Sequence, residues 1–434
     1  MNVNLTSDPV LNTQVLQTAL DKGGIVRVED PGSYDVEGPL WIGSHTALIF
    51  GPGVVIRRSE GGQSKPFIVN KGLFKGEWND HIRIEGLHLV TNGVDLTHFS
   101  IYPGLRGHLA FLKVRDLVIR DYECCDLTKL GYGIHICTFE DILLEQLHIE
   151  GDKDGVHLSD GRYFTIRDSS FRTYDDAIAL NAYDYCLSTA VYGDVEDGLI
   201  ENCHDYAGNS RSVGYFCRML GGAWTDWSEG MRVQNSTLAV YDGHLYSVCL
   251  PLPPEKREKD LISTVPPTHK YGVETFGGIP WRYVREHRGT YEATVRRITC
   301  RNIYLHKPRV GFGFTVEGGL WSESVPAGVK LPVIEDLVFD RILVECDPIY
   351  VFGGGHPVRT VRVSNSTVRG NILATSVYQN HKAEEYPPLD IIFTGVHIPR
   401  SEGVFLLQNV AERPVDIQVI ACSGDGFPEK FSKK

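Results

Sequence analysis

The sequence predicts an all-β fold, a single-stranded right-handed parallel β-helix, because a strand pattern recurs and no helical periodicity separates its copies. In each copy an apolar residue is followed two positions later by an amide or a carboxylate. A second short apolar stretch and a turn with Gly or Asp come next. Strands that recur in this way are typical of a solenoid and not of βαβ units. The clearest copies are residues 119–121, 166–168, 200–202, 233–235 and 363–365.

The length of the chain favours one solenoid over two globular domains. A solenoid can lengthen without thickening, so we expect a single β-helix domain over residues 1–434. Its open first coil needs a cover. Residues 12–20 have the apolar spacing of a helix, which predicts a helix within an N-terminal cap over residues 1–30. The recurring Asn or Asp suits the turns, because these residues tolerate left-handed backbone angles.

One long segment interrupts the repeat. Residues 251–290 contain Pro-Leu-Pro-Pro, a charge cluster at 255–260 and an aromatic, basic stretch at 279–283. A segment of this length inside a compact repeat is more often a functional loop than a linker. We therefore expect an inserted loop beside a groove.

Composition excludes several partners. The formal net charge of -12 is unfavourable for binding nucleic acid or an anionic membrane. No apolar run approaches the ~20 residues of a membrane span, and residues 1–8 are polar, so the expected location is cytoplasmic, or secreted if a leader has been removed. Ten cysteines without a CxxC pair predict free thiols, with no disulfide scaffold, metal site or cofactor.

Two acidic motifs carry the chemistry. Asp154, in Asp-Lys-Asp-Gly, and Asp176, in Tyr-Asp-Asp, are 22 residues apart (176 minus 154), which is about one solenoid coil. They should therefore stack at the ~4.8 Å spacing of neighbouring strands, with Asp175 beside them. Like charges this close favour a proton on one carboxyl at neutral pH. A glycosidase needs this arrangement, with one carboxyl as acid and another as base.

Strand parity orients the neighbouring residues. Val156 and Leu158 must face the core, so His157 faces outward, and the preceding coil places His135 outward in the same way. Tyr132 then lies near Asp154. The two imidazoles are candidate donors to sugar hydroxyls or to a carboxylate. Trp281, flanked by Arg282 and Tyr283, is a candidate platform for stacking on a sugar ring.

These residues resemble the polygalacturonase-like family of inverting glycoside hydrolases, family 28, over roughly residues 8–250. The specific likeness lies in Asp152-Lys-Asp-Gly, where the family has Asn-Thr-Asp-Gly, and in the spacing to Asp175-Asp176. The resemblance implies a parallel β-helix that cleaves pectin-like polysaccharides. It also implies that Asp175 is the general acid and that Asp154 and Asp176 hold and activate the water.

Two family motifs are replaced, which affects the expected substrate. Arg211-Ser-Val-Gly-Tyr stands where the family has Gly-His-Gly, with Val213 in place of the histidine, and His244-Leu-Tyr246 stands where it has the uronate-gripping Arg-Ile-Lys. Arg211, Arg218 or Lys153 could supply charge from another direction. A neutral sugar, or a uronate held through His135, His157 or Arg218, is therefore expected in place of the usual galacturonate geometry.

The sequence thus predicts a glycoside hydrolase that acts on a pectin-like plant or microbial polysaccharide, or on its oligosaccharides, with inversion. Because residues 251–290 directly follow the strand with His244 and Tyr246, we expect them to close the groove and make the enzyme exo-acting. Three alternatives stay open. They are a polysaccharide lyase with Lys153 or Arg218 as base, a carbohydrate-binding solenoid like a tailspike, and a calcium site formed by the carboxylates.

Overall fold

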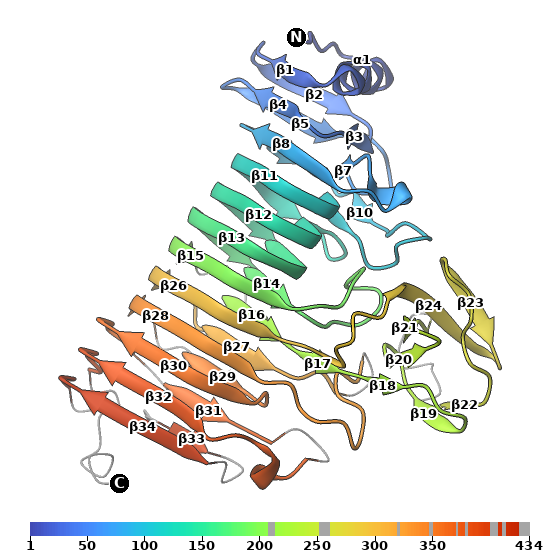
Figure 1. Ribbon diagram of the computed structural model, residues 1–434. Coiled ribbons are helices and arrows are strands. Elements are labelled where there is room, and N and C mark those ends of the chain that lie inside the picture. The colour runs from blue at the N-terminus through green and yellow to red at the C-terminus, as the bar shows by residue number, and fades with distance from the viewer. Residues whose placement is uncertain are drawn as a thin grey trace.

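The structure is a right-handed parallel β-helix, as the sequence predicts (Figure 1). Its coils are stacked from β1 (Gly24–Val28) near the N-terminus to β34 (Val415–Ile420) near the C-terminus, and a smaller set of strands projects to one side. The computed structural model describes residues 1–206, 213–250, 261–318, 322–346, 350–369, 372–377, 381–399, 407–409 and 414–424.

The first coils lie under an N-terminal helix. They are formed by α1 (Pro9–Lys22), β1, β2 (Gly32–Val36), β3 (Leu40–Ile42), β4 (Thr46–Phe50), β5 (Val54–Arg58), β7 (Ile68–Asn70), η1 (Leu73–Lys75), β8 (Asn79–Glu85) and β9 (His88–Val90), with β6 (Gln63–Ser64) paired to β10 (Asp95–Leu96) at the side. Asp8 caps α1 by accepting from the amides of Val10 and Leu11. Leu16 and Leu20 are buried in the solenoid core, so α1 covers the first coil as expected.

The middle and last coils carry the longest strands. The middle set is β11 (Gly107–Leu127), β12 (Tyr132–Gly151), β13 (Val156–Thr173), β14 (Ile178–Asn181), β15 (Val195–Asp205) and β16 (Cys217–Leu220). The last set is β26 (Val295–Leu305), β27 (Phe312–Thr315), β28 (Ile334–Val344), β29 (Phe352–Gly354), β30 (Val358–Ser364), β31 (Leu373–Thr375), η3 (Ala383–Glu385), β32 (Leu389–Thr394), β33 (Leu407–Asn409) and β34.

The register confirms the 22-residue coil at the acidic motifs. Ile134 pairs with Val156, and Val156 pairs with Ile178, each step being 22 residues. The same core column continues through Cys217 to Phe312. Among the described residues, no helix has both the length and the apolar character that a membrane crossing requires. None of the ten cysteines forms a disulfide bond in the structure.

The recurring Asn and Asp positions are left-handed turns, as the repeat predicts. Asp121, Asp168, Asn202 and Asn365 have φ between 49° and 52°. Left-handed residues at these positions bend the strands without breaking the stack. Asn235 is the exception, because it lies outside the solenoid and accepts from the amide of Leu250.

The chain leaves the solenoid after β16 and returns at β26, so the excursion begins earlier than residue 251. A five-stranded sheet forms most of it, and its core includes Val233, Tyr246 and Trp281. Its strands are β18 (Thr225–Asp226), β20 (Leu238–Tyr241), β21 (His244–Val248), β24 (Ile279–Glu286) and β23 (Val273–Phe276), beside the pairs β17 (Gly222–Ala223) with β25 (Glu292–Ala293) and β19 (Met231–Val233) with β22 (Leu261–Ser263).

The aromatic stack inside the last coils gives a test of the core. The ring of Phe339 lies 4.5 Å from that of Phe312 and 4.7 Å from that of Phe352, and its side chain is fully buried. We expect Phe339→Ala to lower the free energy of unfolding by about 3–5 kcal/mol in urea denaturation, because it leaves a cavity. The exposed Tyr163→Ala is the control, with a change within about 0.5 kcal/mol. Equal losses in the two variants would contradict this packing.

Candidate active site

The three aspartates of the acidic motifs lie together in the turns before β13 and β14. The amide of Gly155 donates to the carbonyl of Asp176 at 2.9 Å, which continues the strand register into the turn. One oxygen from each of Asp154, Asp175 and Asp176 lies within 4.8 Å of the other two. Gly155 permits this close stacking, because a Cβ there would lie 2.7 Å from the carbonyl oxygen of Ala177.

Asp154 is an ionised carboxylate. Its Oδ2 lies 3.0 Å from His157 Nδ1, and its Oδ1 lies 3.5 Å from Lys153 Nζ. Burial alone would raise the pKa of Asp154, but the charge of Lys153, the contact with His157 and the charge of Arg218 hold it well below its usual range. Asp154 can therefore accept a proton from a water but cannot donate one.

Asp176 is in the opposite electrostatic state. Its Oδ1 accepts from the amide of Tyr215 at 2.8 Å, and its Oδ2 lies 3.9 Å from Arg218 Nη1. Burial, followed by the charges of Asp175 and Asp154, raises the pKa of Asp176 well above its usual range. Burial, with the neighbouring carboxylates as a second cause, therefore favours the protonated form of this carboxyl.

Asp175 is the most accessible of the three and is paired with Lys153. Its side chain is 29% exposed, against 5% for Asp154 and 3% for Asp176. Lys153 Nζ donates to Asp175 Oδ2. Burial would lower the pKa of Lys153, but Asp154 and Asp175 raise it well above its ordinary value. Lys153 is thus a fixed ammonium between two carboxylates.

A pocket of about 370 Å³ opens above these groups, and we call it the aspartate pocket. Arg106 Nη2 donates to the hydroxyls of Tyr132 at 3.1 Å and Tyr185 at 2.8 Å, which joins the solenoid to the loop after β14. Arg218 donates to Glu317 on the far wall. The lining residues are Arg106, Lys129, Leu130, Tyr132, Lys153, Asp154, Asp175, Asp176, Asp184, Tyr185, Ser188, Arg218 and Glu317.

Tyr132, Lys153 and Arg218 line the aspartate pocket, where the sequence places them. His135 and His157 face away from the solenoid core as parity predicts, but both are fully buried under a second layer. The prediction that they contact substrate is therefore wrong. His157 instead stacks on Tyr132 at 4.5 Å between ring centroids and holds Asp154.

The residues predicted from the excursion do not line the aspartate pocket. His244 and Tyr246 lie in β21, and Tyr246 is buried while its hydroxyl donates to the carbonyl of His269. Trp281 is fully buried in the core of the excursion, so the prediction that it forms a sugar platform is wrong. Arg211 lies outside the described residues.

Several pocket residues escaped the sequence reasoning. Asp184, Tyr185 and Ser188 lie on the loop after β14, and no sequence pattern singled out any of them. Glu317 follows β27, which pairs with β16 across the whole excursion. Arg218 and Glu317 are 99 positions apart in the sequence, so no local pattern could indicate that they are neighbours.

The three aspartates have the oxygen ligands that a hard cation prefers. The ammonium of Lys153, however, already supplies positive charge between Asp154 and Asp175. A calcium ion would have to displace it. A cation at the three carboxylates would therefore compete with Lys153.

Comparison with known proteins places the fold. No family model matches the chain, and no curated protein matches it. Its fold is similar to an exopolygalacturonase from Thermotoga maritima, with 11% identity, 97% of this chain and 92% of that chain covered and a TM-score of 0.54. It is also similar to the catalytic unit of a family 87 α-1,3-glucanase from Streptomyces thermodiastaticus, with 12% identity, 97% and 67% covered and a TM-score of 0.51.

A third similar structure is the tailspike protein of the Escherichia coli bacteriophage HK620, with 10% identity, 98% and 64% covered and a TM-score of 0.50. Identities this low show a shared fold alone. The chain therefore shares the right-handed parallel β-helix fold with polysaccharide-active enzymes and with a phage tailspike.

Proposed function

We propose that this protein is a glycoside hydrolase that cleaves a pectin-like polysaccharide in the aspartate pocket. One observation carries the proposal. Asp154 and Asp176, on adjacent coils, lie together with Asp175 in the aspartate pocket, and their surroundings lower the pKa of Asp154 and raise the pKa of Asp176. Acid and base assignments in enzymes follow from such pairs.

In this proposal Asp176 donates its proton to the leaving glycosidic oxygen, and Asp154 accepts a proton from the attacking water. A water that donates two hydrogen bonds of about 2.8 Å spans oxygens about 4.5–5 Å apart. The aspartate oxygens lie within 4.8 Å of one another, so one water can bind two of them at once. The resemblance instead assigns the proton donor to Asp175, and the two assignments give different pH profiles.

Inversion remains the proposed stereochemical course. Inverting enzymes separate the two carboxyl groups by roughly 6.5–9.5 Å. The 4.8 Å limit between nearest oxygens allows carboxyl carbons up to about 7 Å apart, because each C–O bond adds about 1.2 Å. The largest separation of two carboxyl carbons that this limit allows thus reaches the lower end of the range for inverting enzymes. Proton NMR that identifies the anomer formed first tests whether the reaction inverts.

Hydrolysis is favoured over elimination. In the lyase alternative, a basic residue such as Lys153 or Arg218 must be deprotonated before it can remove a proton from the sugar. The carboxylates raise the pKa of Lys153, and burial raises the pKa of Tyr132, so both stay protonated at neutral pH. Arg218 donates to Thr315 and Glu317 and stays charged. The basic residues of the pocket are thus poor bases.

The proposed substrate carries uronate groups. Arg106 and Lys129 line the aspartate pocket, and no described carboxylate forms an ion pair with either. Arg106 Nε is buried and has no hydrogen-bond partner. A substrate carboxylate would satisfy it by a charge-assisted hydrogen bond. We therefore assign to Arg106 the binding of the uronate carboxylate, which the sequence suggested for His135 and His157.

We expect the enzyme to be exo-acting, but the segment that closes the groove differs from the one predicted from the sequence. The described part of residues 251–290 does not line the aspartate pocket. Instead Arg282 Nη1 donates to the carbonyls of Cys186 and Thr189, both at 2.9 Å, in the loop that carries Tyr185 and Ser188. We propose that this braced loop ends the groove.

Product analysis on polygalacturonate, a rhamnogalacturonan and aryl glycosides tests the function. We expect new reducing ends without the ultraviolet absorbance of an unsaturated product, and one short product from the first time point by anion-exchange chromatography. Early products of mixed length would contradict exo action. Ultraviolet absorbance would indicate a lyase, and binding without turnover would indicate a tailspike-like binding module.

A further inference from the structure

A second cavity lies where the excursion meets the solenoid, and we call it the seam pocket. Its volume is about 580 Å³, which is within the range of small-ligand sites. The solenoid contributes Phe74, Lys75 and Lys113, and the excursion contributes Lys270, Tyr271 and Arg282. It shares no lining residue with the aspartate pocket.

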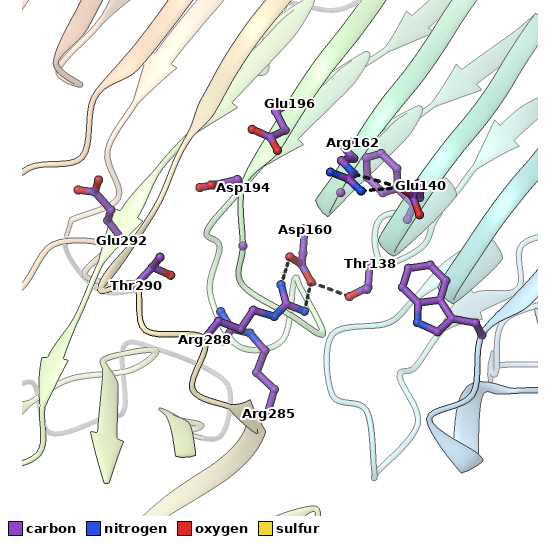
Figure 2. A pocket seen from close by; sticks show the side chains of 14 residues that line it. Thr138, Glu140, Asp160, Arg162, Asp194, Glu196, Arg285, Arg288, Thr290 and Glu292 are labelled. Carbon is purple, nitrogen blue, oxygen red and sulfur yellow. Dashed lines mark hydrogen bonds and ion pairs between the residues drawn. The ribbon is translucent and has the colours of Figure 1, made fainter. Parts of the chain in front are cut away.

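The seam pocket is strongly basic although the chain as a whole is acidic. Lys75, Lys113, Lys270 and three arginines line it, against the single carboxylate of Glu286. Arg288 is the only one of these cations for which the described residues supply a carboxylate at hydrogen-bond distance. Its Nη1 donates to Asp160 at 2.7 Å. Figure 2 shows this pair among the residues that line a neighbouring pocket. Excess positive charge therefore remains in the seam pocket.

Two of the arginines have buried donors without partners. Arg282 is 1% exposed, and its Nη1 donates to the carbonyls of Pro103, Cys186 and Thr189. Its Nε and Nη2 have no hydrogen-bond partner, and neither has Arg285 Nε. Burial, and then the charge of Arg288, lower the pKa of Arg285 to about 10. An anion in the seam pocket would satisfy these donors and relieve the repulsion between the guanidinium groups.

Aromatic rings lie beside these cations. Tyr271 is 58% exposed and Phe74 is 41% exposed, and the other two tyrosines of the lining are Tyr102 and Tyr283. Flat rings pack against the apolar faces of ligands, and a tyrosine adds a hydroxyl at its edge. Rings together with cations suit a ligand that has apolar faces and negative charge, which is the chemistry of an acidic sugar.

One loop separates the two pockets. Tyr185 and Ser188 line the aspartate pocket, whereas Ala190 and Val191 line the seam pocket. Five residues of chain from 185 to 190 span at most about 18 Å, at up to ~3.6 Å per residue. The two pockets therefore lie on either side of one short loop.

We propose that the seam pocket is a second carbohydrate site that binds a uronate-bearing part of the polysaccharide away from the bond that is cleaved. The identity of that polysaccharide rests on the proposed function, but the site does not. The carboxylates of the sugar would meet Arg282, Arg285 and Lys270. The sugar faces would pack on Tyr271 and Phe74.

Calorimetric titration of the full chain with a defined oligogalacturonate tests the proposal. We expect Lys270→Ala/Tyr271→Ala to weaken binding at least tenfold and to raise KM for polygalacturonate to a similar extent, with kcat on a short substrate unchanged. The matched control is Lys22→Ala/Tyr163→Ala, which removes an exposed lysine and an exposed tyrosine elsewhere and should bind like the wild type. Fully methyl-esterified oligogalacturonate should bind wild-type protein at least tenfold more weakly.

Unchanged binding in the seam-pocket variant would overturn the proposal. So would inorganic phosphate that competes as strongly as the oligogalacturonate, since the seam pocket would then be a simple anion site. If the titration gives the expected loss but no substrate is hydrolysed, the proposed function fails and the carbohydrate site stands. If hydrolysis occurs and the seam-pocket variant binds normally, the proposed carbohydrate site fails and the proposed function stands.

Discussion

Asp176→Asn should lower turnover by about 10²–10⁴, because it removes the carboxyl that holds the proton without changing its volume. The wild-type rate should fall at alkaline pH, as Asp176 loses its proton through its raised pKa. The residual activity of the variant should lack this alkaline fall. The measurement is kcat against pH for both proteins on the substrate identified by product analysis.

The same substitution should not destabilise the protein at pH 8. The pKa of Asp176 is higher in the folded state than in the unfolded state. Its contribution to stability is therefore complete below the ordinary pKa of an aspartate and is lost as pH rises through the folded pKa. An asparagine never ionises, so the variant should unfold in urea at an equal or higher midpoint than the wild type. Catalysis would then be maintained at the expense of stability.

Asp168→Asn is the matched control for both measurements. Asp168 is a left-handed turn residue outside the aspartate pocket, and Asn202 occupies the corresponding turn of the next coil. Its turnover and urea midpoint should match the wild type. A fall in turnover of less than tenfold for Asp176→Asn, with Asp168→Asn unchanged, would remove Asp176 from the mechanism.

The features that the sequence predicted correctly are those that follow from the repeat. The 22-residue coil brought Asp154 and Asp176 together, and Asn or Asp marked left-handed turns, because both properties follow from strand register. Parity also gave the correct outward direction for His157. Parity cannot say what lies above an outward side chain, and here Tyr132 and the loop after β14 bury it.

The sequence could not predict contacts between residues that are close in space but lie on opposite sides of the excursion in the sequence. Glu317 reaches Arg218 only because β27 pairs with β16 across the excursion. Trp281 looked exposed because its segment is basic and aromatic. Trp281 instead lies in the core of the excursion, and Tyr283, two residues further along β24, packs against the same core. The side of a strand that is buried follows from its partner strands, and these were hidden in the sequence.

Asp175→Asn should also lower turnover by about 10²–10⁴, and its pH profile decides which aspartate donates the proton. Asp175 neutralises Lys153, so an amide leaves the ammonium of Lys153 to act on Asp154 alone. If Asp176 holds the proton, the alkaline fall in kcat persists in Asp175→Asn, because that limb belongs to Asp176. If Asp175 donates, as the resemblance implies, the alkaline fall disappears. Lys153→Met/Asp175→Asn removes the ammonium together with its carboxylate partner, so its turnover should be at least tenfold higher than that of Asp175→Asn. If Asp175 is the proton donor, the double variant should be as slow as Asp175→Asn.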